Sequence, residues 1–121
     1  MSGETDLDRL LAGLEPRLDR VEYGFEPVAE PPSLGGVFAL IREEEGLTAI
    51  RPGSGWARIT LGVHSSLEAV GLTARIAGAL AESGIAANIV AGLRHDHLFV
   101  PWGRREEALA VLAGLSRAGA R

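Results

Sequence analysis

Apolar and polar residues recur along this chain with periods that predict short helices and strands. In the first half, helical spacing occurs over residues 5–14, at Leu7, Leu10, Leu11 and Leu14. Thr5 precedes this apolar stripe, and Asp8 lies three residues after Thr5, so we expect Thr5 to cap the helix. Alternating and apolar runs predict strands over residues 21–28, 37–41 and 47–52.

The connections in the first half are rich in turn residues. Residues 29–36 contain several prolines and glycines and are expected to form a loop, and residues 42–46 form a charged turn. The segment Arg-Pro-Gly-Ser-Gly at 51–55 is the best internal boundary. We therefore expect two units, residues 1–55 and residues 56–121.

The second half shows a clearer succession of elements. Strands are expected over residues 57–63, 86–93 and 97–102, and helices over residues 65–83 and 104–118. Ser65 and Glu68 have the capping-box spacing at the start of the first of these helices. Gly84 followed by Ile85 is typical of a helix end with a left-handed glycine.

This β-α-β-β-α order corresponds to most of a ferredoxin-like split βαβ arrangement and predicts an α+β fold. The unit lacks one strand, because the last helix ends close to the end of the sequence. An uncovered sheet edge favours aggregation, so we expect another segment to pair with it. Since the first half supplies three strands, we expect the two halves to share strands or pack their sheets around one core.

Composition excludes several kinds of chemistry. The 121 residues include no cysteine, which excludes disulfides, thiolate metal ligands and cysteine nucleophiles. All twelve basic residues are arginine, which excludes Schiff-base and P-loop lysines. The net charge is −4 and the arginines are scattered, so nucleic acid is not an expected partner.

The length and the apolar content predict an ordinary hydrophobic core. A chain of this size buries about 65% of the surface that its unfolded form exposes. No apolar run approaches the roughly 20 residues of a membrane helix, so we expect no membrane partner. The first eight residues are acidic and lack the apolar run of a signal peptide, so we expect a cytoplasmic location.

The segment from residue 63 to residue 72 is a candidate anion site. A helix that begins at Ser65 offers free N–H groups and the positive end of its dipole to a carboxylate. Gly71 lies inside this expected helix, where glycine costs about 1 kcal/mol relative to alanine, and close approach of a ligand explains its presence. The alternative is a plain serine cap, with Gly71 allowing only close packing of helix and sheet. Asn88 interrupts an apolar strand, and its amide either recognises a ligand or faces solvent.

Three further clusters of polar residues have simpler structural explanations than a metal-binding or catalytic role. His95 and His97 alternate along a strand and could share a metal ion, but no third ligand is identifiable, so a polar hairpin turn is expected. The acidic run at 43–45 is expected to be a solvated turn. The His-Ser-Ser run at 64–66 lacks the nucleophile-elbow sequence of hydrolases. We therefore expect no metal, no cofactor and no catalytic activity.

Two runs of sequence carry a family resemblance. VGLTARIAGALAESGIAANIV combines a glycine in the first helical turn, an amphipathic helix, a Gly-Ile pair and an Asn-Ile pair, and VFALIREEEGLTAIRP precedes it. Residues 56–116 resemble an ACT domain, and residues 37–52 resemble the N-terminal unit of the small free-standing bacterial proteins that contain two successive ACT-like units. The chain departs from the family at Ala69 and Val70, where many members have Asp and Pro before the glycine.

ACT domains are regulatory modules that commonly bind amino acids or similar small ligands, often between paired domains. The resemblance therefore implies a non-catalytic module with a small-molecule ligand, and it implies a homodimer. The ligand-binding residues that it implies are His64, Ser65, Ser66, Leu67, Val70, Gly71, Leu72, Asn88 and Ile89. The alternatives are a ligand-free interaction or assembly module and a small enzyme.

Overall fold

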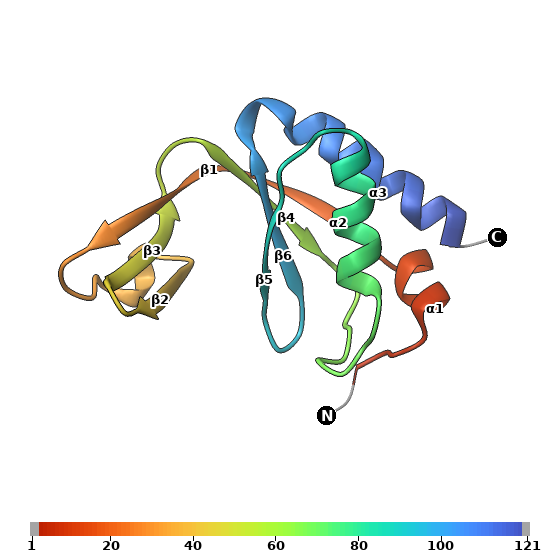
Figure 1. Cartoon of the computed structure of the whole chain (residues 1–121), viewed down its shortest axis with the longest axis horizontal. Helices are drawn as coiled ribbons and strands as arrows, with labels where there is room; N and C mark the ends of the chain where they lie inside the picture. The colour runs from red at the N-terminus through yellow and green to blue at the C-terminus, as the bar shows by residue number, and fades with distance from the viewer. Residues whose placement is uncertain (1–2, 120–121) are drawn as a thin grey trace.

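A computed structural model describes residues 3–119, which form three α-helices and six strands (Figure 1). The helices are α1 (Leu7–Ala12), α2 (Leu72–Glu82) and α3 (Arg105–Gly119). The strands are β1 (Pro16–Val28), β2 (Ala39–Glu43), β3 (Gly46–Pro52), β4 (Trp56–Leu61), β5 (Asn88–Ala91) and β6 (Asp96–Pro101). Short 3₁₀ turns cover Leu34–Gly36 and Trp102–Arg104. None of the described helices has the length and apolar character that crossing a membrane requires.

One antiparallel sheet runs through both halves of the chain in the order β2-β3-β1-β4-β6-β5. The elements β4, α2, β5, β6 and α3 form the predicted β-α-β-β-α unit. β1 pairs with β4, with Leu18 opposite Ile59, and so occupies the edge at which that unit lacks a strand. Further along, β1 pairs with β3, with Phe25 opposite Ile50. The predicted ferredoxin-like α+β fold with a shared core is confirmed.

The three helices lie on one side of the sheet and form the main core with it (Figure 1). The short helix α1 contributes Leu10 and Leu11, and Leu14 follows it. These leucines belong to the same buried cluster as Ile59 of β4 and Leu112 of α3. Burying one such side chain contributes about 1.5–3 kcal/mol. Packing therefore holds a six-residue helix that would be marginal in isolation.

Aromatic residues gather on the opposite side of the sheet, called here the helix-free face. Tyr23, Ile50 and Phe99 are the buried centre of a second apolar cluster, with Phe38 and Trp56 packed against it. The rings of Tyr23 and Phe99 meet edge to face, with 5.7 Å between their centroids. Edge-to-face contacts of this kind add to the stabilisation that burial alone provides. The hairpin of β2 and β3 extends on this side of the molecule (Figure 1).

The helix that the pattern predicts from Ser65 begins only at Leu72. Ser65 instead forms a short parallel bridge with Glu4. The hydroxyl of Ser66 accepts a hydrogen bond from the N–H of Glu68 at 3.0 Å. These contacts satisfy backbone groups outside a helix, so the predicted capping box and helical start are wrong.

Glycines define both ends of α2. Gly71 has φ +96° and is the N-cap of the helix, so its predicted place inside the helix is also wrong. At the other end Gly84 has φ +70°, and the N–H of Ile85 donates to the carbonyl of Leu80 at 2.9 Å. This is the Schellman arrangement, and the predicted left-handed helix end is confirmed.

Other boundaries move by a few residues. Asp6, and not Thr5, caps α1, because its carboxylate accepts the N–H of Arg9 at 3.0 Å. β1 begins at Pro16 instead of residue 21, because its first residues pair with the end of β4. β5 covers only the middle of the strand predicted over residues 86–93.

Candidate functional site

The loop between β4 and α2, residues 62–71, is fixed against the N-terminal segment. The N–H of Glu4 donates to the carbonyl of His64, and the N–H of Ser66 donates to the carbonyl of Glu4, both at 3.0 Å. A Cβ on Gly3 would lie 2.7 Å from the backbone N of Ser66, so the two segments are in close contact. The red segment before α1 passes beside the green loop before α2 (Figure 1). The N-terminal segment therefore sets the shape of this loop.

A hollow of about 90 Å³ lies among this loop, the start of α2 and the hairpin of β5 and β6. Its lining residues are Ser65, Ser66, Leu67, Ala69, Leu72, Thr73, Ala91 and Asp96. Gly71 has no side chain to cap α2, so the first N–H groups of the helix gain no acceptor from the N-cap residue. Free N–H groups and the positive end of the helix dipole favour an anion at this position.

Asp96 brings a carboxylate to the same hollow. The hydroxyl of Ser65 donates to its Oδ2 over 3.4 Å, which is a long hydrogen bond. Burial raises the pKa of Asp96 above its ordinary value of 3.8, while the Ser65 hydrogen bond and the charge of His95 partly oppose this rise. A carboxylate has about four acceptor positions, so Asp96 retains capacity to bind a cation.

The structure brings together part of the predicted set of residues. The lining of the hollow includes four of them: Ser65, Ser66, Leu67 and Leu72. His64 and Gly71 lie on the same loop, and Val70 there is 84% exposed. Asn88 is exposed on β5, opposite Phe99 in the strand pairing, and Ile89 packs against the main core. Neither of these two β5 residues lines the hollow.

Sequence reasoning missed four lining residues: Ala69, Thr73, Ala91 and Asp96. Asp96 carried a usable signal, since it is an acidic residue in the turn before a buried strand. Thr73 lies in the first turn of α2, but the pattern placed that turn seven residues earlier, so its hydroxyl was overlooked. Ala69 and Ala91 have no chemistry that a sequence pattern could indicate.

The histidines of the β5–β6 hairpin make separate contacts. His97 Nδ1 lies 2.9 Å from the hydroxyl of Thr60, and His95 Nδ1 lies 3.4 Å from the carbonyl of Val63. Burial, with the charges of Arg58 and His95, lowers the pKa of His97 below its ordinary value of 6.5. Within residues 3–119, no three or more His, Cys, Asp or Glu side chains are grouped to hold a metal ion.

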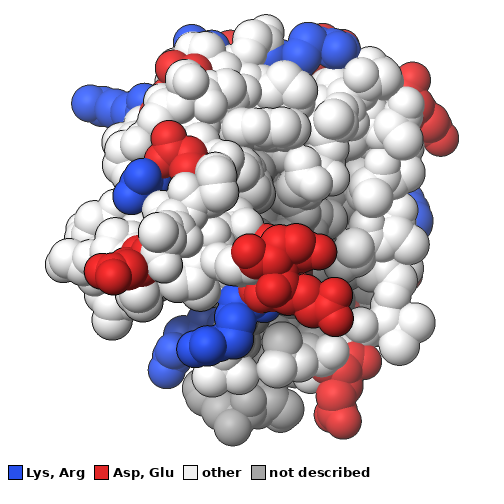
Figure 2. All heavy atoms as spheres, turned by 60° about the vertical axis from the view of Figure 1, so that its left-hand side comes forward, with Lys and Arg blue, Asp and Glu red and all other residues white. Residues whose placement is uncertain are grey.

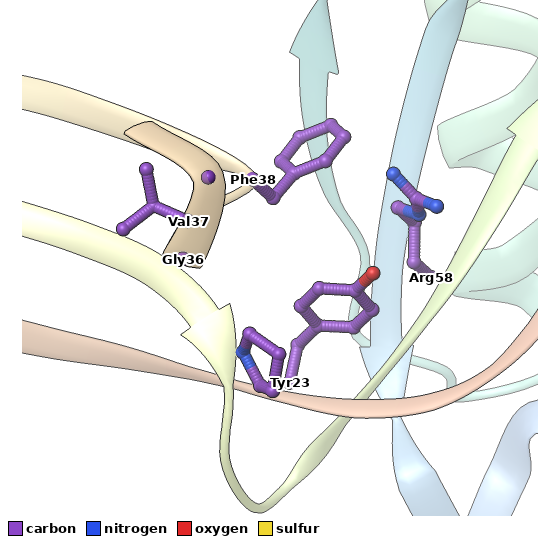
Figure 3. A pocket seen from close by; sticks show the side chains of 7 residues that line it. Tyr23, Gly36, Val37, Phe38 and Arg58 are labelled. Carbon is purple, nitrogen blue, oxygen red and sulfur yellow. The ribbon is translucent and has the colours of Figure 1, made fainter. Parts of the chain in front are cut away.

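A second concave region lies on the helix-free face. One hollow of about 260 Å³ is lined by Tyr23, Phe38, Arg58 and the chain at residues 35–37 (Figure 3). The hydroxyl of Tyr23 lies beside the Arg58 side chain there, and the guanidinium extends toward Phe38 (Figure 3). A neighbouring hollow of about 460 Å³ shares Arg58 and extends to Arg17.

Asp19 organises the hydrogen bonds of this region. Its Oδ2 accepts from Arg58 Nη2 at 2.5 Å and from the Tyr23 hydroxyl at 2.9 Å, and its Oδ1 accepts from the N–H of Val21 at 3.0 Å. Burial alone raises the pKa of Asp19, but these hydrogen bonds and the charge of Arg58 outweigh it, and the pKa falls below 3.8. Burial and the hydrogen bond to Asp19 raise the pKa of Tyr23 above 10.0.

No local sequence signal indicated this second region. The register of β1 against β4 shifts between Leu18 and Glu22, and this bulge brings Asp19 to Arg58. A bulge depends on the partner strand, so the sequence of β1 alone does not reveal it.

Figure 2 shows the side of the molecule from which the β2–β3 hairpin extends. Charged side chains on this side form small groups of both signs, with no continuous basic area among the described residues in view. A nucleic-acid-binding surface requires a basic patch or stripe. The face in Figure 2 does not present one.

The sheet, the helices on one side and the hollow beside α2 define a small α+β module of the ferredoxin-like class. Two family models, both described as ACT domain, match residues 2–54 and residues 53–114. The chain belongs to the ACT-domain family.

Solved structures share the fold of this chain. The chain is similar to a protein of unknown function from Vibrio cholerae, described as a possible transport protein, with 40% identity, a TM-score of 0.80 and coverage of 91% of this chain and 95% of that chain. A protein from Agrobacterium tumefaciens shares the fold, with 19% identity, a TM-score of 0.69 and coverage of 85% and 89%. So does the ligand-free regulatory subunit of aspartate kinase from Thermus thermophilus, with 12% identity, a TM-score of 0.65 and coverage of 85% and 97%. No curated protein matches the sequence.

Proposed function

We propose that this protein is a non-catalytic regulatory module that binds an amino acid in the hollow beside α2. The observation that carries the proposal is the hollow itself, which combines an uncapped helix start with the carboxylate of Asp96. Membership of the ACT-domain family and the fold shared with a regulatory subunit of aspartate kinase support it. Residues 56–121 supply the ligand site in this proposal, and residues 1–55 complete the sheet and brace the loop.

The two ends of the hollow suit the two charges of an amino acid. The ligand carboxylate accepts from the first N–H groups of α2, at Leu72 and Thr73, with help from the hydroxyls of Ser65 and Ser66. The ligand ammonium pairs with Asp96. Binding of a cation favours the ionised form of Asp96, so affinity falls as pH drops through the pKa of this residue.

A second copy of the chain completes the site in this proposal. Pockets that bury small ligands span about 300–1,000 Å³, and the hollow in one chain measures about 90 Å³. Exposed apolar side chains lie on the segments that form it: Leu67 and Val70 on the loop, and Leu93 in the β5–β6 turn. A homodimer that covers this loop encloses the ligand and buries these side chains.

The proposal is tested by a thermal-shift screen of the purified protein against amino acids, followed by calorimetry on the best ligand. Saturation at about 100 times Kd stabilises the fold by about 2.7 kcal/mol. We expect Asp96→Asn to weaken the best ligand roughly tenfold or more, because a charge-assisted hydrogen bond to the ammonium is lost. Glu44→Gln removes a carboxylate from the exposed β2–β3 turn and is the matched control, with unchanged affinity. Equal affinity in Asp96→Asn and the wild type would remove Asp96 from the site.

A further inference from the structure

The helix-free face holds a concave region that the proposed function does not use. Its two hollows, of about 260 Å³ and about 460 Å³, meet at Arg58, and they share no lining residue with the hollow beside α2. Both hollows are open to solvent, and the larger one has a volume within the size range of small-molecule pockets. This region is therefore large enough for a ligand of its own.

Aromatic rings form one wall of the region. The guanidinium carbon of Arg58 lies 4.7 Å from the ring centroid of Phe38 and 5.3 Å from that of Tyr23. The Phe38 ring also meets the imidazole of His97 edge to face, at 4.9 Å between centroids. The Phe38 and Tyr23 rings lie on the same side of the Arg58 guanidinium, and Gly36 and Val37 lie beyond the rings, away from Arg58 (Figure 3). The guanidinium lies over both rings, and a flat apolar group fits against the part of Phe38 that lines the hollow.

The same region has an excess of positive charge. Arg58 and Arg17 both line the larger hollow, and Asp19 is the one carboxylate among the residues that line the two hollows. Asp19 already accepts from Arg58, Tyr23 and Val21. Arg58 makes its ion pair through Nη2, and Nη1 donates to no acceptor within residues 3–119. One guanidinium donor group therefore stays available, and Arg17 adds a second cation.

We propose that this face binds a small aromatic carboxylate. The ring of the ligand lies against Phe38 and Tyr23, and its carboxylate lies between the guanidinium groups of Arg58 and Arg17. Guanidinium groups match planar carboxylates through paired hydrogen bonds, and they also stack on aromatic rings. Asp19 positions Arg58 for this contact by holding Nη2.

Phenylacetate is the probe for this site, with inorganic phosphate as the comparison anion. Titration of the full-length protein is followed by calorimetry and by NMR of the backbone amides and the arginine Nε–H groups. We expect phenylacetate to shift the amides of residues 35–38 and the Nε–H of Arg58, and to bind more tightly than phosphate. Arg58→Lys retains the charge beside Asp19 but loses the planar donor edge, and we expect it to weaken binding roughly tenfold.

Two further variants separate the site from general charge effects. Arg17→Gln changes an exposed residue that lines the larger hollow, and we expect it to weaken phenylacetate several-fold without loss of folding. Arg42→Gln removes the same charge from the exposed part of β2, outside both hollows, and leaves the affinity unchanged. The proposal is overturned by the absence of phenylacetate binding, by equal affinity in all three variants, or by shifts confined to residues 65–73. Phosphate binding as tight as that of phenylacetate would overturn the aromatic part of the ligand class.

Discussion

Asp19 stabilises the helix-free face through charge and hydrogen bonds. It joins β1 to β4 through the ion pair with Arg58 and fixes the Tyr23 hydroxyl. The side chains of Asp19 and Arg58 are 21% and 23% exposed, so water screens the pair less than it screens a surface pair. Arg58 Nε is buried without an acceptor among the described residues. The paired charge of Asp19 therefore offsets part of the cost of burying the Arg58 guanidinium.

The variant Asp19→Asn tests this role through its pH dependence. The pKa of Asp19 in the folded protein lies below its ordinary value of 3.8, so its stabilising contribution is present above 3.8 and is lost as pH falls through the folded pKa. We expect the variant to lower the free energy of unfolding by about 1–3 kcal/mol at neutral pH, and by progressively less in acid. Chemical denaturation at several pH values measures the difference. A difference that stays constant down to strongly acidic pH contradicts the role.

The contrast between the two hollows shows what single residues reveal in a sequence. Ser65 and Ser66 were named because a helix was expected to begin at Ser65; the helix begins only at Leu72, yet both residues line the hollow beside α2. Arg58 and Asp19 were missed because their importance depends on a bulge and on pairing between distant strands. When a site is formed by side chains from two paired strands, the residue spacing within either strand does not indicate it.

At the scale of elements, apolar periodicity predicted the type and order of the helices and strands of residues 3–119 well. It failed at the start of α2, where the spacing of Ser65 and Glu68 imitates a capping box. Local spacing could not show that Glu4 pairs with the 62–71 loop, which draws that segment out of the helix. The end of α2 was predicted correctly because Gly84 and Ile85 act locally, within the helix that they end.

The position of Gly71 leads to a prediction about α2. At φ +96° an L residue is strained, while a Cβ there would meet only Leu7 side-chain atoms at 3.5 Å or more. We expect Gly71→Ala to lower the free energy of unfolding by about 1–3 kcal/mol, through backbone strain and not through a clash. Gly78→Ala, in the middle of the same helix with open space around its Cβ, is the control and should stabilise by about 0.5–1 kcal/mol. Equal effects of the two substitutions in denaturation experiments would show that Gly71 is an ordinary helical residue.

At the scale of the whole molecule, β1 is the element that makes one domain of two halves. It pairs with β4 along its first part and with β3 along its second, so the sheet and the main core both cross the internal boundary. Because an exposed sheet edge favours aggregation, some segment was expected to pair with the uncovered edge, which is β4. Which segment does so could not be predicted, because several strands of the first half have compatible patterns.

The proposed homodimer is a property of the whole molecule that can be measured directly. If a second copy covers the loop beside α2, sedimentation equilibrium gives twice the chain mass of 12.7 kDa. Replacing Val70, which is 84% exposed on that loop, by serine should weaken the dimer because apolar area leaves the interface. Leu34→Ser changes a side chain of similar exposure in the turn before β2 and should leave the dimer intact. A monomer at high micromolar concentration, or equal weakening by both variants, would place no interface at the loop.

Binding of an amino acid at the start of α2 can be followed residue by residue in an NMR titration of the wild-type protein. With the best ligand from the screen, we expect saturable shifts of the amides of Leu72 and Thr73, because these N–H groups gain the ligand carboxylate as acceptor. The amides of Ser65 and Asp96 should move with the same affinity. Shifts that leave residues 65–73 and Asp96 unchanged, or no shift with any proteinogenic amino acid at millimolar concentration, would contradict an amino-acid site at the start of α2.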